Sequence, residues 1–145
     1  MVDEQLLSRK LSQLRQYVSE LRKAEDITWS IFNSDIRAKA FVERYIHLAI
    51  EKMIDIGNHL ISFNKWREPQ GYRDIFQVLN ENGIIPENRL KEFQNMASFR
   101  NILVHEYEKI EDELVFVAFK KRLGDFEEFI ELVKGWVEKN SSKEE

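Results

Sequence analysis

The chain has 145 residues and no cysteine, and its 22 Lys and Arg against 26 Asp and Glu give a formal net charge of −4. The length fits one domain, and the lack of cysteine excludes disulfides, iron–sulfur clusters, thiolate zinc sites and cysteine nucleophiles. Only 5 Gly and 2 Pro are present, which favours long helices over turn-rich β folds and leaves no glycine-rich phosphate loop.

Apolar residues at helical spacing predict two long helices in the first half of the chain. The first covers about residues 4–24 and carries one apolar stripe. The stripe consists of Leu7, Leu11, Leu14, Val18 and Leu21. The second helix begins near Ser34 or Asp35, either of which can cap it, and runs to about Phe63. Because this helix is apolar over much of its girth, we expect it to pack on several partners, one of which could be a second subunit.

The second half of the chain is predicted to contain three further helices. Their expected ranges are about residues 72–82, 87–104 and 112–139. The stretch 114–119 has strand propensity, but no second strand is available to pair with it, so we assign it to the last helix. The chain is therefore predicted to be all-α, with about five helices.

Charge and composition along the chain indicate one domain over residues 1–139 and a polar, disordered tail over residues 140–145. Residues 1–105 contain 15 basic and 14 acidic side chains, whereas residues 106–145 contain 7 and 12. The body is nearly neutral, so the net charge does not exclude a local basic cleft. No secretory signal and no apolar stretch of about 18 residues is visible, so we expect a cytoplasmic protein that does not contact a membrane.

One helix in the second half breaks the apolar pattern. Arg100 lies within the apolar stripe of the predicted helix 87–104, where an unpaired charge would be costly to bury. A polar line follows beside this stripe and consists of Gln94, Ser98, Asn101 and His105. Taken singly, each residue has an ordinary structural explanation: Arg100 as a salt-bridged side chain, His105 as a capping or solvated residue, and Tyr107 as a core aromatic.

Taken together, residues 100–107 have the pattern R-N-x-x-x-H-x-Y. This octet resembles the motif of the HepT-like ribonuclease toxins, a branch of the HEPN superfamily. The resemblance extends over residues 43–60, which are similar to the family's long second helix, and over residues 71–110, which are similar to the block that follows it. It covers roughly residues 5–138 in all.

The resemblance implies an up-and-down helical bundle that forms a homodimer. It also implies a metal-independent endoribonuclease without a cofactor, in which Arg100 and His105 meet in a cleft at the dimer interface and Asn101 supports them. These residue types suit the chemistry, because histidine titrates near neutral pH and a guanidinium presents a fixed fork to phosphate. The expected product is a 2′,3′-cyclic phosphate.

The resemblance also implies a regulatory partner. HepT-like toxins form type VII toxin–antitoxin pairs with a minimal nucleotidyltransferase antitoxin, which transfers AMP from ATP onto the motif tyrosine, here Tyr107. Added bulk and negative charge beside the cleft would repel RNA. The expected partners are therefore RNA, the cognate nucleotidyltransferase and a second copy of the chain, and the homodimer could be part of a larger hetero-oligomer.

Two other interpretations remain open. The chain could be a non-catalytic helical dimer that only binds its nucleotidyltransferase partner, or a helper subunit whose cleft binds ATP or AMP. The intact set of Arg100, Asn101, His105 and Tyr107 favours catalysis, because a binding-only relative has no chemical need for all four. No metal site is expected, since His47 and His59 lack a carboxylate pair at ligand spacing. The loop residues Trp66 and Arg67 could reach the substrate.

Overall fold

The computed structural model describes the backbone of residues 4–104 and 110–144 and the side chains of residues 4–101 and 112–140. Over these residues the chain is an all-α bundle without a strand, as predicted. Its elements are α1 (Glu4–Lys23), α2 (Trp29–Ser34), α3 (Ile36–Phe63), α4 (Tyr72–Glu81), the 3₁₀ helix η1 (Glu87–Arg89), α5 (Leu90–Val104), α6 (Ile110–Lys121) and α7 (Leu123–Glu144). None of the described helices is long and apolar enough to cross a membrane.

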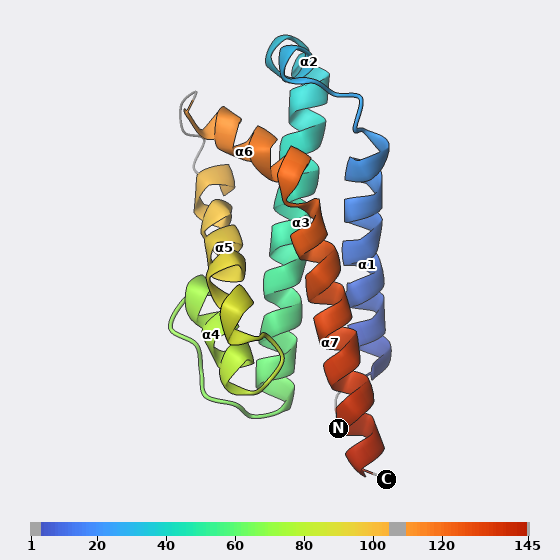
Figure 1. The fold of residues 1–145 in the computed structure, drawn as a ribbon, viewed down its shortest axis with the longest axis vertical. Helices are drawn as coiled ribbons and strands as arrows, with labels where there is room; N and C mark the ends of the chain where they lie inside the picture. The colour runs from blue at the N-terminus through green and yellow to red at the C-terminus, as the bar shows by residue number, and fades with distance from the viewer. Residues whose placement is uncertain (1–3, 105–109, 145) are drawn as a thin grey trace.

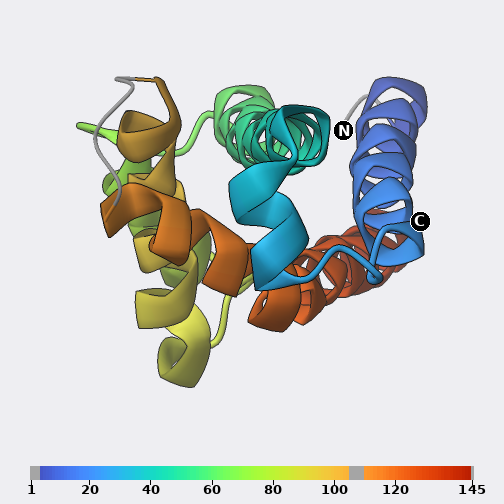
Figure 2. The same ribbon diagram turned by 90° about the horizontal axis from the view of Figure 1, so that it is seen from above.

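The long helix α3 lies at the centre of the bundle (Figures 1 and 2). Helices α1 and α7 pack together on one side of it, and α4 and α5 pack together on the other side. This arrangement explains why α3 is apolar over much of its girth, as its buried residues face partners on both sides. The buried residues of α3 are Val42, Ile46, Ala49, Ile50, Met53, Ile54, Ile56, Gly57, Leu60 and Ile61.

The predicted start of the long helix is confirmed, and a short helix that the sequence did not predict precedes it. The Asp35 carboxylate accepts hydrogen bonds from the backbone N–H groups of Arg37 and Ala38, at 2.9 and 3.3 Å, which caps α3. Helix α2 is capped in the same way, since the Thr28 hydroxyl accepts a bond from the Ile31 N–H at 3.2 Å.

The predicted single helix over residues 112–139 is wrong, because the chain breaks at Arg122 into α6 and α7. The apolar pattern in the sequence does not reveal this break, because it continues across it: Phe119 at the end of α6 and Leu123 at the start of α7 are both buried. Helix α6 crosses the end of the bundle, whereas α7 runs along α1 (Figure 1). Packing on two different partners therefore decides the break. Helix α7 also includes residues 140–144, which we expected to form a polar tail.

An aromatic cluster joins the two sides of the bundle. The rings of Phe76, Phe93 and Phe129 come from α4, α5 and α7, and their centroids lie 5.9 to 6.4 Å apart. All three side chains are fully buried. Rings at this spacing in offset or edge-to-face contact fix the relative positions of their helices. The cluster therefore holds α5, which carries Arg100, against α4.

Candidate functional site

Of the four predicted site residues, the structure describes Arg100 and Asn101, which lie in the last turns of α5. Asn101 is exposed, and 27% of the Arg100 side chain is accessible. His105 and Tyr107 lie outside the described residues, so the expected meeting of Arg100 with His105 stays a prediction.

Arg100 is held on two sides by residues from other helices. Its Nε donates a hydrogen bond to Oε1 of Glu51 on α3 at 2.7 Å. Its guanidinium carbon lies 4.8 Å from the ring centroid of Tyr72 at the start of α4, which is a cation–π contact. The need for a partner, which the apolar position of Arg100 predicts, is thus met by a carboxylate and an aromatic face.

This arrangement leaves the outer edge of the guanidinium available. Glu51 occupies Nε, while Nη1 and Nη2 have no hydrogen-bond partner among the residues whose side chains are described. These two nitrogens form the fork that binds a phosphate or carboxylate in a bidentate manner. Arg100 therefore has the geometry of an arginine that can bind an anion, with the plane of its guanidinium fixed by Glu51 and Tyr72.

His47 lies one helical turn before Glu51, and its Nε2 is 3.4 Å from the same Glu51 oxygen that pairs with Arg100. The site therefore contains His47, a residue whose sequence position had suggested at most a metal ligand. The spacing of four residues between His47 and Glu51 on a helix was the available signal. Glu51 itself could have been suspected, because a carboxylate next to buried Ile50 on an apolar helix is a suitable partner for a half-buried arginine.

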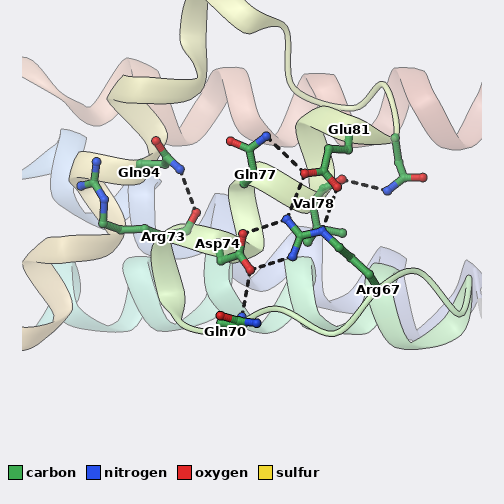
Figure 3. A network of polar contacts seen from close by, with 9 residues as sticks. Arg67, Gln70, Arg73, Asp74, Gln77, Val78, Glu81 and Gln94 are labelled. Atoms are coloured by element: carbon green, nitrogen blue, oxygen red, sulfur yellow. Dashed lines mark hydrogen bonds and ion pairs between the residues drawn. The ribbon is translucent and has the colours of Figure 1, made fainter.

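A polar network joins the loop after α3 to α4, the helix that begins at Tyr72 (Figure 3). The Arg67 guanidinium donates two hydrogen bonds to Asp74 at 2.8 Å each and two to Glu81 at 2.9 Å each. The Gln70 N–H donates to Asp74 at 2.9 Å. Hydrogen bonds from Arg67 and then from Gln70 lower the pKa of Asp74 to about 2. The network ties the loop after α3 to α4.

The loop residues proposed from the sequence as substrate contacts are thus engaged elsewhere. Arg67 is committed to two carboxylates, and Trp66 packs edge-on against Trp136 of α7 with ring centroids 5.4 Å apart. The expectation that these two side chains reach substrate is not supported by their contacts. Both stabilise the loop between α3 and α4.

The polar line of α5 is also used within the protein. Ser98 Oγ accepts a hydrogen bond from Nη1 of Arg73 at 3.0 Å, and Asn95 Oδ1 accepts another from the same nitrogen at 3.2 Å. Gln94 Nε2 donates to the Arg73 carbonyl oxygen at 3.1 Å. Helix α5 therefore presents two exposed asparagines, Asn95 and Asn101, and a second arginine is docked on its surface.

The fold and this arginine-bearing helix define the class: an all-α bundle in which the motif arginine of α5 pairs with a carboxylate of the long central helix. Residues 9–133 match the family model described as ribonuclease HepT-like, and the chain belongs to this family, within the HEPN superfamily.

Similar proteins include two nucleases. The chain is 31% identical to the mRNA nuclease HepT of Shewanella oneidensis over 105 residues, which is 72% of this chain and 79% of that protein. It is 24% identical to the tRNA nuclease HepT of Aphanizomenon flos-aquae over 136 residues, which is 94% of this chain and 92% of that protein.

Two solved structures have the same fold. One is the tri-AMPylated HEPN toxin of Shewanella oneidensis in complex with the MNT antitoxin, with a TM-score of 0.80 and 27% identity, covering 93% of this chain and 99% of that one. The other is a toxin–antitoxin complex with AMP-PNP, with a TM-score of 0.81 and 25% identity, covering 90% and 98%.

Proposed function

We propose that the chain is the toxin of a toxin–antitoxin pair and acts as a cytoplasmic endoribonuclease that needs no metal. The observation that carries this proposal is the geometry of Arg100. Glu51 binds its Nε and Tyr72 covers one face, and no described side chain occupies the guanidinium fork, which can therefore bind a phosphate. The nuclease names of the two HepT relatives support the choice of RNA as substrate.

The proposed reaction uses the substrate's own nucleophile. A histidine base takes the proton of the RNA 2′-hydroxyl, the 2′-oxygen forms a bond to phosphorus, and the bond from phosphorus to the 5′-oxygen breaks. A second, protonated histidine gives its proton to the leaving 5′-oxygen. The products are a 2′,3′-cyclic phosphate and a 5′-hydroxyl, so atoms and protons balance. His105 is the proposed base and, from the second copy in a homodimer, the proposed acid.

Arg100 and Asn101 assist the reaction by binding the phosphate, on which negative charge develops, and by orienting the histidine. The Arg100 fork binds two oxygens of the phosphate and stabilises the additional negative charge of the pentavalent state. Asn101, one turn before His105 in sequence, orients the imidazole or binds a further phosphate oxygen.

The proposed control of the activity is AMPylation of Tyr107 by a cognate nucleotidyltransferase. The tyrosine oxygen attacks the α-phosphorus of ATP, pyrophosphate leaves, and the adenylate remains on the toxin. The tri-AMPylated state of the Shewanella oneidensis toxin in its antitoxin complex supports this proposal. Added negative charge next to the Arg100 site would compete with RNA for the guanidinium.

One observation favours the second candidate function, a non-catalytic subunit that only binds its nucleotidyltransferase. The Glu51 carboxylate neutralises Arg100, as it would in a purely structural ion pair. On this reading the motif stabilises the bundle and supplies no chemistry.

Induced expression distinguishes the two functions. We expect the wild-type chain to arrest growth, and Arg100→Ala and His105→Ala to relieve the arrest at equal protein levels. The purified wild-type chain should cleave RNA in the presence of EDTA, and thermal unfolding should show that both variants are folded. Equal harmlessness of all three chains would support the binding-only subunit, and loss of cleavage with EDTA would refute the metal-free mechanism.

A further inference from the structure

Arg73 differs in its partners from the other arginines that make short contacts. The other arginines with short contacts are paired with carboxylates: Arg22 with Glu127, Arg67 with Asp74 and Glu81, Arg89 with Asp125 and Glu128, and Arg100 with Glu51. Arg73 instead donates to the neutral Asn95 amide oxygen at 3.2 Å and the Ser98 hydroxyl at 3.0 Å. No carboxylate among the described residues pairs with it, and its side chain is exposed.

Neutral acceptors orient a guanidinium without offsetting its charge. Both hydrogen bonds use Nη1, so Nε and Nη2 have no partner among the described residues and can bind an anion. The backbone of Arg73 is fixed as well, because Gln94 donates to its carbonyl oxygen at 3.1 Å. In Figure 3 the Arg73 side chain points away from the cluster around Arg67 and towards the helix that carries Gln94. Three polar side chains of α5 thus hold a positive charge that no carboxylate of the described side chains offsets.

The position of Arg73 links it to the candidate site. Arg73 directly follows Tyr72, whose ring makes the cation–π contact with Arg100. The first turn of α4 therefore supplies both Arg73 and the aromatic partner of Arg100. Its partner Ser98 lies three residues before Asn101 and on the same face of α5, whereas Arg100 follows Ser98 by two residues and lies on another face. A helix rises about 1.5 Å per residue, so Ser98 and Asn101 are separated by about 4.5 Å along the axis.

We propose that Arg73 is a second phosphate-binding residue of the RNA site, which binds a backbone phosphate adjacent to the one that Arg100 binds. Asn95 and Ser98 act as positioning residues that aim its guanidinium. The proposal rests on the proposed ribonuclease function. Arg73 then contributes to substrate affinity and not to the chemical step, because a flanking phosphate carries the same charge before and during the reaction.

The test is the binding of a single-stranded 2′-O-methyl oligoribonucleotide, which lacks the attacking hydroxyl and cannot be cleaved. Fluorescence anisotropy at several salt concentrations gives the affinity and its salt slope. Arg73→Met should bind roughly tenfold more weakly than wild type, and the slope of log K against log salt should fall by about 0.7. Arg73→Lys should keep the slope, because it keeps the charge, while losing part of the affinity.

Arg9→Met is the matched control, since it removes the same charge from an exposed position on α1, across α3 from the site. It should leave affinity and slope nearly unchanged. In a cleavage assay, Arg73→Met should raise KM about tenfold with kcat within about twofold of wild type. Circular dichroism checks folding, and Ser98→Ala with Asn95→Ala provides a second variant that loosens Arg73 and keeps its charge.

Equal affinity and slope for Arg73→Met and Arg9→Met would overturn the proposal. So would normal RNA binding by Arg73→Met combined with loss of its complex with the nucleotidyltransferase, because Arg73 would then belong to a protein interface. A wild-type chain that binds RNA through Arg73 without cleaving it would refute the proposed catalysis alone. Absence of RNA binding by the wild-type chain would refute both.

Discussion

At the scale of single residues, the environment of Arg100 accounts for its apolar position in the sequence. A half-buried arginine is tolerated where a carboxylate and an aromatic face replace water, and Glu51 and Tyr72 supply both. Neither partner is close to Arg100 in sequence. The same contacts fix the plane of the guanidinium, which is what a phosphate-binding fork requires.

Replacing Glu51 should therefore disturb catalysis more than substrate binding. We expect Glu51→Ala to lower kcat by about tenfold to a hundredfold with a smaller change in KM, because Arg100 loses its fixed orientation for the transition state. Glu51→Gln keeps an acceptor for Nε and should retain most of the rate. Steady-state kinetics of both variants provides the measurement. Equal losses in kcat for Gln and Ala would contradict a positioning role and indicate a need for the charge.

Tyr107 can be tested by a substitution that removes one oxygen. Tyr107→Phe should remain an active ribonuclease and should not be neutralised by the nucleotidyltransferase with ATP, because the acceptor hydroxyl is missing. Intact-mass spectrometry of the wild-type chain after the same incubation should show added adenylate, and Tyr17→Phe should still accept it. Adenylate on Tyr107→Phe at the wild-type level would place the modification elsewhere.

At the scale of elements, the contact between α3 and α4 depends on a glycine. A Cβ atom built on Gly57 of α3 would lie 2.6 Å from Cγ2 of Ile75, a buried residue of α4. Ile75 is β-branched and buried, so it has little freedom to move away. Gly57 thereby allows α4 to approach α3 closely enough for Tyr72 to reach Arg100.

Gly57→Ala should therefore destabilise the fold by about 1–3 kcal/mol, because overpacking outweighs the gain in helix propensity. Gly135 is the matched control: it lies in α7, is exposed, and a Cβ there would meet nothing within 4 Å. Gly135→Ala should stabilise the protein by up to about 1 kcal/mol. Urea unfolding measures both. Stabilisation by both substitutions would show that α3 and α4 separate without cost.

The loop before α4 should respond to pH through Asp74. Arg67 lowers the pKa of this carboxyl from 3.8 to about 2, so the folded state binds the proton less readily than the unfolded state. The ion pair therefore stabilises the fold above about pH 4, and this contribution is lost as the pH falls towards 2. Asp74→Asn should unfold at a lower urea concentration than wild type at pH 7, with the difference shrinking between pH 4 and pH 2. Asp26→Asn, an exposed change after α1, is the control for the loss of one carboxylate.

At the scale of the whole molecule, the bundle places two pairs of helices on opposite sides of α3, and the motif helix belongs to one pair (Figure 2). A single copy carries one His105, whereas the proposed reaction needs an acid and a base at once. A homodimer would bring two copies of the motif to one site.

Analytical ultracentrifugation should then give twice the 17.4 kDa mass of the chain at the concentrations used for cleavage. Specific activity should fall on dilution below the dissociation constant of the dimer, since a composite site is lost with the partner. A monomer that retains full specific activity on dilution would contradict a shared site.

The sequence alone determined the all-α class, the long helix from Ser34 or Asp35 to about Phe63 with its several packing partners, and the residues of the motif. These features are local, because helical periodicity, capping chemistry and the octet can each be read within one turn or a few turns of the chain. The family membership followed from the same residues and was confirmed by the match over residues 9–133.

Only the tertiary structure decided what the local pattern leaves open. The break at Arg122 depends on α6 and α7 packing on different partners, while the apolar stripe runs through it unchanged. The partners of Arg100 and the neutral cradle of Arg73 join helices that are 22 to 49 residues apart in sequence. No periodicity within one helix specifies which side chain of another helix will face it, so these contacts, and the site that they form, exist only once the bundle is packed.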